Sequence, residues 1–252
     1  MKEFKQWHEE KTFKFNSQTT IYFSQCTKNG ILSFNELLKL TSDIAVEDFN
    51  QRNMSRETML KNHFMILVSR NSFRIHNAPK ENQLVTISTW EEKSEIFQFI
   101  RAYEITDTLT GEKLISGLST WLLVDSQNRK LLPIKKYNLR EPVETVTEHD
   151  CIKPSKIAVD EENLKLIAER KINFSDIDAN GHTNNSRYGA FIMDSLPLEY
   201  AEKTFKDIRI NYSKEAMLGE TLKIYAHFDE SQNKITVIGK TSENSFEAEL
   251  YY

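Results

Sequence analysis

Hydrophobic residues recur at helical spacing over residues 34–49, and this pattern predicts the first helix of the chain. Ser33 before it and Glu36 three residues later predict a capping box at its start. A short helical turn is expected over 55–61. The apolar positions of the long helix share one face: Phe34, Leu37, Leu38, Ile44, Ala45 and Phe49.

Strands are expected next, because β-branched and aromatic residues replace the helical spacing. Val85, Ile87 and Thr89 alternate with polar neighbours, so they should lie on one face of a sheet. The turn 108–111 contains a glycine and should join the last two strands as a hairpin. The predicted strands cover residues 63–75, 84–91, 95–107 and 113–125.

The second half of the chain repeats this order of elements after a Pro-containing, charged segment, 126–170, with one short helix. A strand near 164–174 leads to a polar loop, 175–184. A helix follows over 184–195 and ends before Pro197. Its apolar residues occupy most of the circumference, which predicts a helix buried on nearly all sides. Further strands are expected over 205–212, 220–229, 234–241 and 245–252.

The repeated order predicts an α+β fold, a tandem double hotdog in which each half is an antiparallel sheet wrapped around a buried central helix. We expect an N-terminal hotdog over residues 1–135, a linker over 136–160 and a C-terminal hotdog over 161–252.

Composition narrows the class of protein. The chain has 252 residues, 39% of them hydrophobic, which is enough for a substantial core. Its net charge of −4 gives no basic field for nucleic acid. The N-terminal residues lack an apolar stretch typical of a signal peptide, and no apolar run approaches the ~18 residues of a membrane span. A cytoplasmic protein without a membrane span is therefore expected.

A polar loop, 176–185, contains the side chains that could perform chemistry. It places two carboxylates, several carboxamides and His182 before an apolar helix. A polar turn with asparagine caps would have the same composition. A helix N-terminus, however, directs free N–H groups at a developing oxyanion, so backbone groups near Asn184 and Asn185 are candidate oxyanion donors.

The sequence of this loop and the helix after it, DIDANGHTNNSRY, resembles the D-x-D-x-N-x-H-x-N-N-x-x-Y signature of the acyl-acyl-carrier-protein thioesterases of plants and bacteria. The stretches 119–124 and 210–215 resemble two further segments of that family, and the similarity covers nearly the whole chain from about Phe13.

The resemblance implies that Asp178, Asn180 and His182 form the catalytic loop and that Glu215 is their acidic partner. Plant members have a cysteine after this glutamate, whereas this chain has Ala216. A cysteine nucleophile is therefore excluded at this position, and we expect a water molecule activated by carboxylate and histidine to attack the thioester. Which of Asp178, Glu215 and His182 is the general base stays open.

The resemblance also implies an acyl carrier protein as partner, with its fatty acyl chain on phosphopantetheine, and an acyl pocket in the first hotdog. Candidate pocket residues are Phe34, Leu38, Met59 and Met65. No cofactor and no metal are expected. Two alternatives remain: an acyl-CoA thioesterase, and a non-catalytic acyl-binding hotdog protein. A homodimer is conceivable because hotdog units commonly pair.

Overall fold

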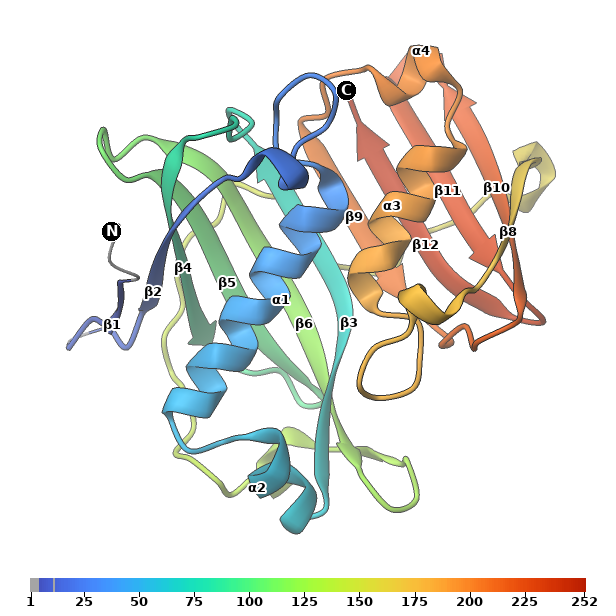
Figure 1. The fold of residues 1–252 in the computed structure, drawn as a ribbon. Helices are drawn as coiled ribbons and strands as arrows, with labels where there is room; N and C mark the ends of the chain where they lie inside the picture. Colours follow the sequence, from blue (N-terminus) through green and yellow to red (C-terminus); the bar gives the residue numbers. More distant parts are fainter. Residues whose placement is uncertain (1–4, 11) are drawn as a thin grey trace. The chain divides into compact units, whose positions relative to one another are not determined.

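The computed structural model describes residues 5–10 and 12–252 (Figure 1). Residues 1–4 and 11, which belong to the expected N-terminal hotdog, lie outside this description. The chain divides into two compact units. Of the described residues, the first contains those up to 33 and 39–154, and the second contains 34–38 and 155–252. The boundary after Pro154 falls inside the segment expected to be a linker.

Antiparallel strands of the first unit pair in the order β1-β2-β4-β5-β6-β3, and β7 adds to β6. The predicted strands are confirmed within a few residues, and the hairpin turn contains Gly111 at φ +75°. The strands are β1 (Gln6–His8), β2 (Phe15–Thr20), β3 (Phe64–Ile75), β4 (Leu84–Glu92), β5 (Gln98–Asp107), β6 (Lys113–Asp125) and β7 (Leu131–Leu132).

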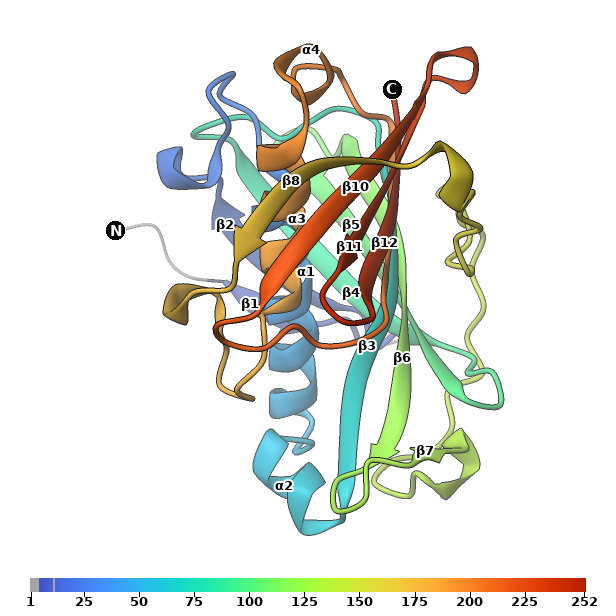
Figure 2. The same cartoon turned by 90° about the vertical axis from the view of Figure 1, so that its right-hand side faces the viewer.

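Helix α1 (Phe34–Gln51) lies across one face of these strands, as Figures 1 and 2 show from two directions. All six apolar residues predicted for its inner face are buried. Asp48 and Phe49, near its C-terminal end, contact Arg101 of β5. The short helix α2 (Arg56–Lys61) begins after Ser55, whose hydroxyl accepts the N–H of Thr58 at 3.3 Å.

The predicted capping box of α1 is wrong. Ser33 is the N-cap residue, but its side chain makes no capping hydrogen bond. Its hydroxyl instead donates to the carbonyl of Gln25 at 2.9 Å. Ser33 therefore fixes the loop that leads into the helix, a tertiary contact that the local sequence pattern does not contain.

Strands β1 and β2 were not predicted from the sequence. The residues of β2, FNSQTT, are mostly polar, and the strand exists because it pairs with β4 along Phe15–Thr89 to Thr20–Leu84. Phe15 is fully buried and anchors this pairing. A strand is recognised in a sequence by the regular spacing of its apolar residues. A strand that is stabilised mainly by backbone hydrogen bonds to its neighbour lacks this spacing.

The opposite face of the first unit is covered by the segment that precedes the boundary. Cys151 packs on Ala102 and Leu118. The ring Nε2 of His149 donates to the carboxylate of Glu92 at 2.8 Å, and Asp150 lies 3.2 Å from His76. Residues up to 151 thus contribute to the first unit although they were expected to be a linker.

The second unit repeats the arrangement with strands in the order β9-β12-β11-β10-β8, all antiparallel. Helix α3 (Asn185–Ser195) lies on one face of them (Figure 2) and exposes only Asp194. A short helix, α4 (Leu198–Ala201), follows. The strands are β8 (Lys165–Lys171), β9 (Asp207–Tyr212), β10 (Thr221–Asp229), β11 (Lys234–Lys240) and β12 (Asn244–Tyr251).

The ring of Tyr188, on α3, lies 5.2 Å from that of Phe246 on β12, so the core of this unit is formed between helix and strands. Each unit therefore has a long helix on an antiparallel set of strands. The predicted α+β, double hotdog fold is confirmed.

Candidate active site

The candidate site lies in the second unit, in the loop between the 3-10 turn Phe174–Asp176 and α3. The carboxylate of Asp178 accepts the N–H of Asn180 at 2.8 Å. Gly181 follows at φ +83°, a backbone conformation that favours glycine. The N–H of Asp178 then donates to the carbonyl of His182 at 2.9 Å and closes the turn. The loop is therefore fixed by its own backbone, and His182 leaves it beside the helix entrance.

The start of α3 is held by a buried carboxylate. Asp176 is 1% exposed and lies 2.9 Å from Arg187 and 3.3 Å from Arg170. Burial alone would raise the pKa of Asp176, but the N–H of Asn173 and the two guanidinium groups lower it below its ordinary value. Asp176 thus stays charged and ties the loop to the helix.

Asn184 is the N-cap of α3, and its side chain accepts the N–H of Ser186 at 2.9 Å. Its own backbone N–H donates to the carbonyl of Asp176 at 2.8 Å. Asn185 is the first residue of the helix, so its N–H belongs to those without an intrahelical acceptor. Of the two candidate oxyanion donors, Asn185 is the better placed.

Glu215 lies in the loop between β9 and β10. Three hydrogen bonds of the next residue, Ala216, hold this loop beside the loop that contains His182. The carbonyl of Ala216 accepts the N–H of Thr183 at 3.1 Å and its hydroxyl at 2.7 Å. The N–H of Ala216 donates to the phenolic oxygen of Tyr188 at 3.2 Å. These contacts bring Oε1 of Glu215 to 3.4 Å from Nδ1 of His182.

Both groups of this pair are open to a ligand, because the His182 side chain is 20% exposed and that of Glu215 is 40% exposed. A carboxylate that holds Nδ1–H of a histidine leaves Nε2 as the basic nitrogen. The structure thus brings together His182 and Glu215, while Asp178 and Asn180 share one turn of the same loop. Tyr188 and Thr183, which position Glu215, were not identified as site residues from the sequence.

The first unit contains the same loop scaffold. The N–H of Thr27 donates to Ile31 at 2.8 Å as that of Asp178 donates to His182, and Gly30 has φ +71°. The N–H of Leu32 donates to the carbonyl of Pro79 at 2.8 Å, as Thr183 does to Ala216. The sequence contains a sign of this repeated loop that was not used in the prediction. The pattern F-S-x-x-x-x-N-G occurs at 23–30 and again at 174–181.

The two scaffolds differ in the side chains that could do chemistry. Thr27, Ile31 and Ala78 stand in the first unit where the second has Asp178, His182 and Glu215. The backbone of this loop therefore forms without acid or base groups. Because folding does not require them, the carboxylates and the histidine of the second unit are candidates for function.

The predicted acyl-pocket residues are placed apart. Met59 is 6% exposed, and its sulfur lies 3.6 Å from the hydroxyl of Tyr137. Met65 is half-buried on β3. Phe34 and Leu38 are buried at the start of α1, in the part of the chain assigned to the second unit.

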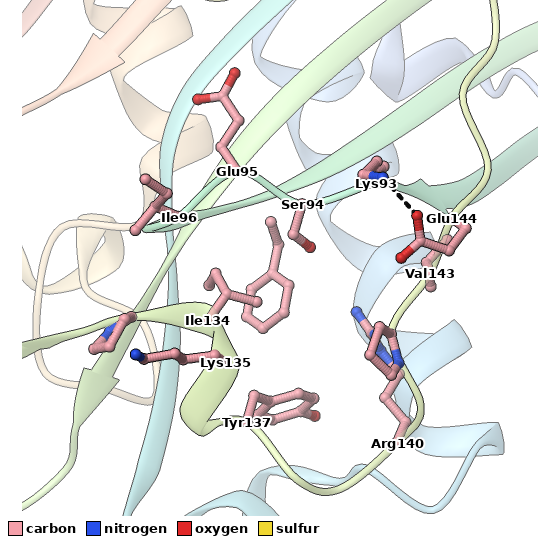
Figure 3. A pocket seen from close by; sticks show the side chains of 13 residues that line it. Lys93, Ser94, Glu95, Ile96, Ile134, Lys135, Tyr137, Arg140, Val143 and Glu144 are labelled. Carbon is pink, nitrogen blue, oxygen red and sulfur yellow. Dashed lines mark hydrogen bonds and ion pairs between the residues drawn. The ribbon is translucent and has the colours of Figure 1, made fainter.

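A cavity of about 620 Å³ lies in the first unit. None of the four predicted residues lines it. Figure 3 shows Ile134, Tyr137 and Arg140 around the hollow, with an ion pair between Lys93 and Glu144 at its rim. Tyr137 lines the cavity and its hydroxyl contacts the sulfur of Met59, so Met59 lies in the layer of residues next to the cavity lining.

Neither cysteine lies in the site. Cys151 is buried against Ala102, and burial raises the pKa of Cys26, which keeps that thiol protonated.

Across residues 5–10 and 12–252, no group of three or more His, Cys, Asp or Glu side chains could hold a metal ion. Among these residues, no helix is both long and apolar enough to cross a membrane.

Two helix-on-sheet units, the second with an acid–histidine loop, define a double hotdog protein with a candidate catalytic site. A family model described as the acyl-ACP thioesterase N-terminal domain matches residues 10–141, and one described as the acyl-ACP thioesterase C-terminal domain matches residues 159–249. The chain belongs to the acyl-ACP thioesterase family.

Plant proteins are among the relatives in sequence. The acyl-[acyl-carrier-protein] hydrolase FATB1, chloroplastic, of Cuphea viscosissima is 23% identical over 69% of this chain and 43% of its own length. The palmitoyl-acyl carrier protein thioesterase, chloroplastic, of Arabidopsis thaliana is 25% identical over 64% of this chain and 40% of its own length. The chain thus spans less than half the length of these curated relatives.

Solved structures share the fold. An acyl-ACP thioesterase from Bacteroides thetaiotaomicron superimposes with a TM-score of 0.86 at 22% identity, covering 94% of this chain and 97% of that one. The 12:0-ACP thioesterase from Umbellularia californica gives a TM-score of 0.81 at 16% identity, covering 94% and 96%. The likeness extends over both units.

Proposed function

We propose that this protein hydrolyses the thioester of fatty acyl-acyl carrier protein to a free fatty acid and the carrier protein. The observation that carries the proposal is the 3.4 Å approach of Glu215 to His182 at the entrance of α3. Family membership supports the substrate class, since the relatives named above are acyl-ACP hydrolases and thioesterases.

In the proposed reaction Glu215 holds Nδ1 of His182, and Nε2 accepts a proton from a water molecule. The oxygen of this water attacks the thioester carbonyl carbon. One carboxylate oxygen of Asp178 accepts the N–H of Asn180, and the second oxygen orients the water. The N–H of Asn185 and the N-terminal end of α3 stabilise the oxyanion.

The tetrahedral intermediate then collapses. The carbon–sulfur bond breaks, and His182 returns the proton to the leaving phosphopantetheine thiolate. The fatty acid and the carrier protein with its free thiol are the products. Because thiolate is a good leaving group, the base has to do little beyond activating water.

The test compares kcat/KM on acyl-carrier protein and acyl-CoA with the same acyl chain. We expect the carrier-protein thioester to be preferred, His182→Ala to lose about 10²-fold or more in rate, and Ile31→Ala to stay near wild type. Ile31 is a matched control because it occupies the position of His182 in the first unit.

Two other outcomes would identify the alternatives. A preference for acyl-CoA would favour an acyl-CoA thioesterase. Tight acyl binding without turnover of either thioester would favour a non-catalytic acyl-binding protein. Location in the cytoplasm and a homodimer stay predictions.

A further inference from the structure

The turn at residues 216–220 of the second unit has a counterpart at residues 79–83 of the first unit. In each turn, the last two residues are hydrogen-bonded to the backbone of an isoleucine. These bonds are Ile172–Glu220 at 2.9 Å and Ile172–Gly219 at 3.0 Å in the second unit, and Ile21–Gln83 at 2.9 Å and Ile21–Asn82 at 2.8 Å in the first. The side chain of the last residue also accepts a backbone N–H within each turn, from Met217 to Glu220 at 2.8 Å and from Lys80 to Gln83 at 2.9 Å.

The two turns differ in the side chains that they expose. Lys80 and Glu81 are exposed in the first unit, as is usual for charged residues. Met217 and Leu218 occupy the same positions in the second unit, and they are 43% and 56% exposed. Because the first turn forms with two charged residues, this backbone structure does not require apolar side chains at these positions.

A third exposed apolar side chain comes from the neighbouring loop. Phe174 is 85% exposed and is the first residue of the 3-10 turn before the candidate catalytic loop. It lies two residues after Ile172, which is hydrogen-bonded to the turn at 216–220. Phe174, Met217 and Leu218, which we call the apolar rim, therefore belong to two loops joined by hydrogen bonds.

The apolar rim lies close to the candidate catalytic groups along the chain. Met217 and Leu218 follow Glu215 by two and three residues, so their Cα atoms lie within about 7 and 11 Å of its Cα. Phe174 precedes Asp178 by four residues, and their Cα atoms lie within about 14 Å. A part of the substrate that contacts the rim is therefore a part near the reacting thioester.

The proposed substrate has two different groups attached to its thioester, an acyl chain on the carbonyl carbon and the phosphopantetheine arm on the sulfur. An apolar acyl chain is stabilised most where it is enclosed by protein. The arm has to lead outward, because a folded carrier protein is attached to its far end. Exposed side chains near the reacting groups therefore suit the arm better than the acyl chain or the body of the carrier protein.

We propose that the apolar rim binds the pantetheine part of the arm, with Phe174, Met217 and Leu218 packed against its methylene and dimethyl groups. This proposal rests on the proposed function for its substrate. The rim contacts the arm equally in the bound substrate and in the transition state, so it lowers KM and leaves kcat unchanged. The first unit, whose loop has no acid–histidine pair, has charged residues in the same turn.

The test gives the second unit the turn sequence of the first, with the double variant Met217→Lys/Leu218→Glu, which keeps the net charge. Steady-state kinetics compare three thioesters of one acyl chain: acyl-carrier protein, acyl-pantetheine and acyl-N-acetylcysteamine, which has only the part of the arm next to the sulfur. KM should rise about tenfold on the first two, because about half of each side chain is left for the arm to cover. Both constants should stay near wild type on the short analogue.

The matched control is Leu166→Lys/Leu198→Glu. These two leucines are similarly exposed in the same unit, on β8 and α4 rather than in the two loops. The control makes the same kind of change in side chains and should leave kcat and KM unchanged on all three thioesters.

A second variant, Phe174→Ser, tests the other loop. It should raise KM on acyl-carrier protein and acyl-pantetheine and leave the short analogue unaffected. Phe23→Ser is its control, because Phe23 is exposed at the equivalent position of the first unit and should not change KM.

Three results would overturn the proposal. An unchanged KM on acyl-pantetheine in either variant would remove the contact. A loss confined to acyl-carrier protein would assign the rim to the body of that protein. An equal loss on the short analogue would assign it to the acyl chain or to the fold.

Failure of the proposed function has a different signature. A wild type that prefers acyl-CoA contradicts the carrier-protein substrate, but coenzyme A contains the same pantetheine arm, so the double variant should still raise KM on it. For a wild type that does not cleave acyl-pantetheine, calorimetry measures binding of an uncleavable pantetheine thioether with an alkyl chain of the same length. Equal affinities of the wild type and the double variant would then reject the role of the rim.

Discussion

Nδ1 of His182 lies 3.4 Å from Oε1 of Glu215. Both residues lie in loops, His182 before α3 and Glu215 between β9 and β10. The approach depends on Ala216, whose carbonyl and N–H are held by Thr183 and Tyr188. The pair is thus positioned by the backbone beside Glu215.

Glu215→Gln should lower kcat on acyl-carrier protein about 10²-fold, because an amide cannot stabilise the protonated imidazole of His182. KM should change little, since Glu215 holds a base rather than the acyl chain. Steady-state kinetics at saturating substrate measure this. Turnover by Glu215→Gln within a few-fold of wild type would remove Glu215 from the mechanism.

Asp178→Thr should keep the loop and lose the chemistry. Thr27 occupies the same position in the first unit, and its hydroxyl accepts the N–H of Asn29 at 3.3 Å as Asp178 accepts that of Asn180. We expect a melting temperature near wild type and a loss of about 10²-fold in kcat. A fully active Asp178→Thr enzyme would show that this carboxylate serves the turn alone.

Gly30→Ala and Gly181→Ala form a matched pair. Both glycines have positive φ, +71° and +83°, and an added Cβ at either meets open space. Each substitution should cost about 1 kcal/mol of unfolding free energy, from backbone strain alone. Only Gly181→Ala should also reduce turnover, because His182 follows it. Urea unfolding with kinetics on both variants checks this, and equal losses of activity would contradict it.

Stability should fall in acid because of Asp48 and Glu91. Burial alone would raise the pKa of each, but the guanidinium groups of Arg101, Arg52 and, for Glu91, Arg140 lower it. The folded protein therefore binds fewer protons than the unfolded chain below about pH 4, where the ordinary pKa values lie. The stabilisation is complete above about pH 5, where both carboxyl groups of the unfolded chain are ionised, and is lost as pH falls further.

The Glu91→Gln variant tests this linkage. It should cost about 3 kcal/mol at neutral pH, since Arg140 loses its carboxylate partner and Arg52 keeps only Asp48. Its unfolding free energy should then depend less steeply on pH below 4 than that of the wild type. Parallel curves for the two proteins in urea titrations from pH 7 to 3 would show that Glu91 does not carry the effect.

Long elements with a clear period were predictable from the sequence. The apolar face of residues 34–49 and the strand 113–125 form as expected, because burial of one face favours the period that the side chains follow. β2 was not predictable, since its polar residues gain their strand geometry from hydrogen bonds to β4. The prediction of a capping box at Ser33 was wrong for a related reason, because the Ser33 hydroxyl donates to the carbonyl of Gln25, outside the helix.

For the candidate site, the sequence by itself determined the chemical groups and the loop that presents them, because Asp178 to Asn184 are neighbours in the chain. Only the tertiary structure decided which acid meets His182, since Glu215 arrives through contacts made by Thr183 and Tyr188. It likewise decided that Asp48, Glu91 and Arg101 gather in one buried cluster. Local patterns record propensity and periodicity, whereas the distance between residues far apart in the chain is set by packing.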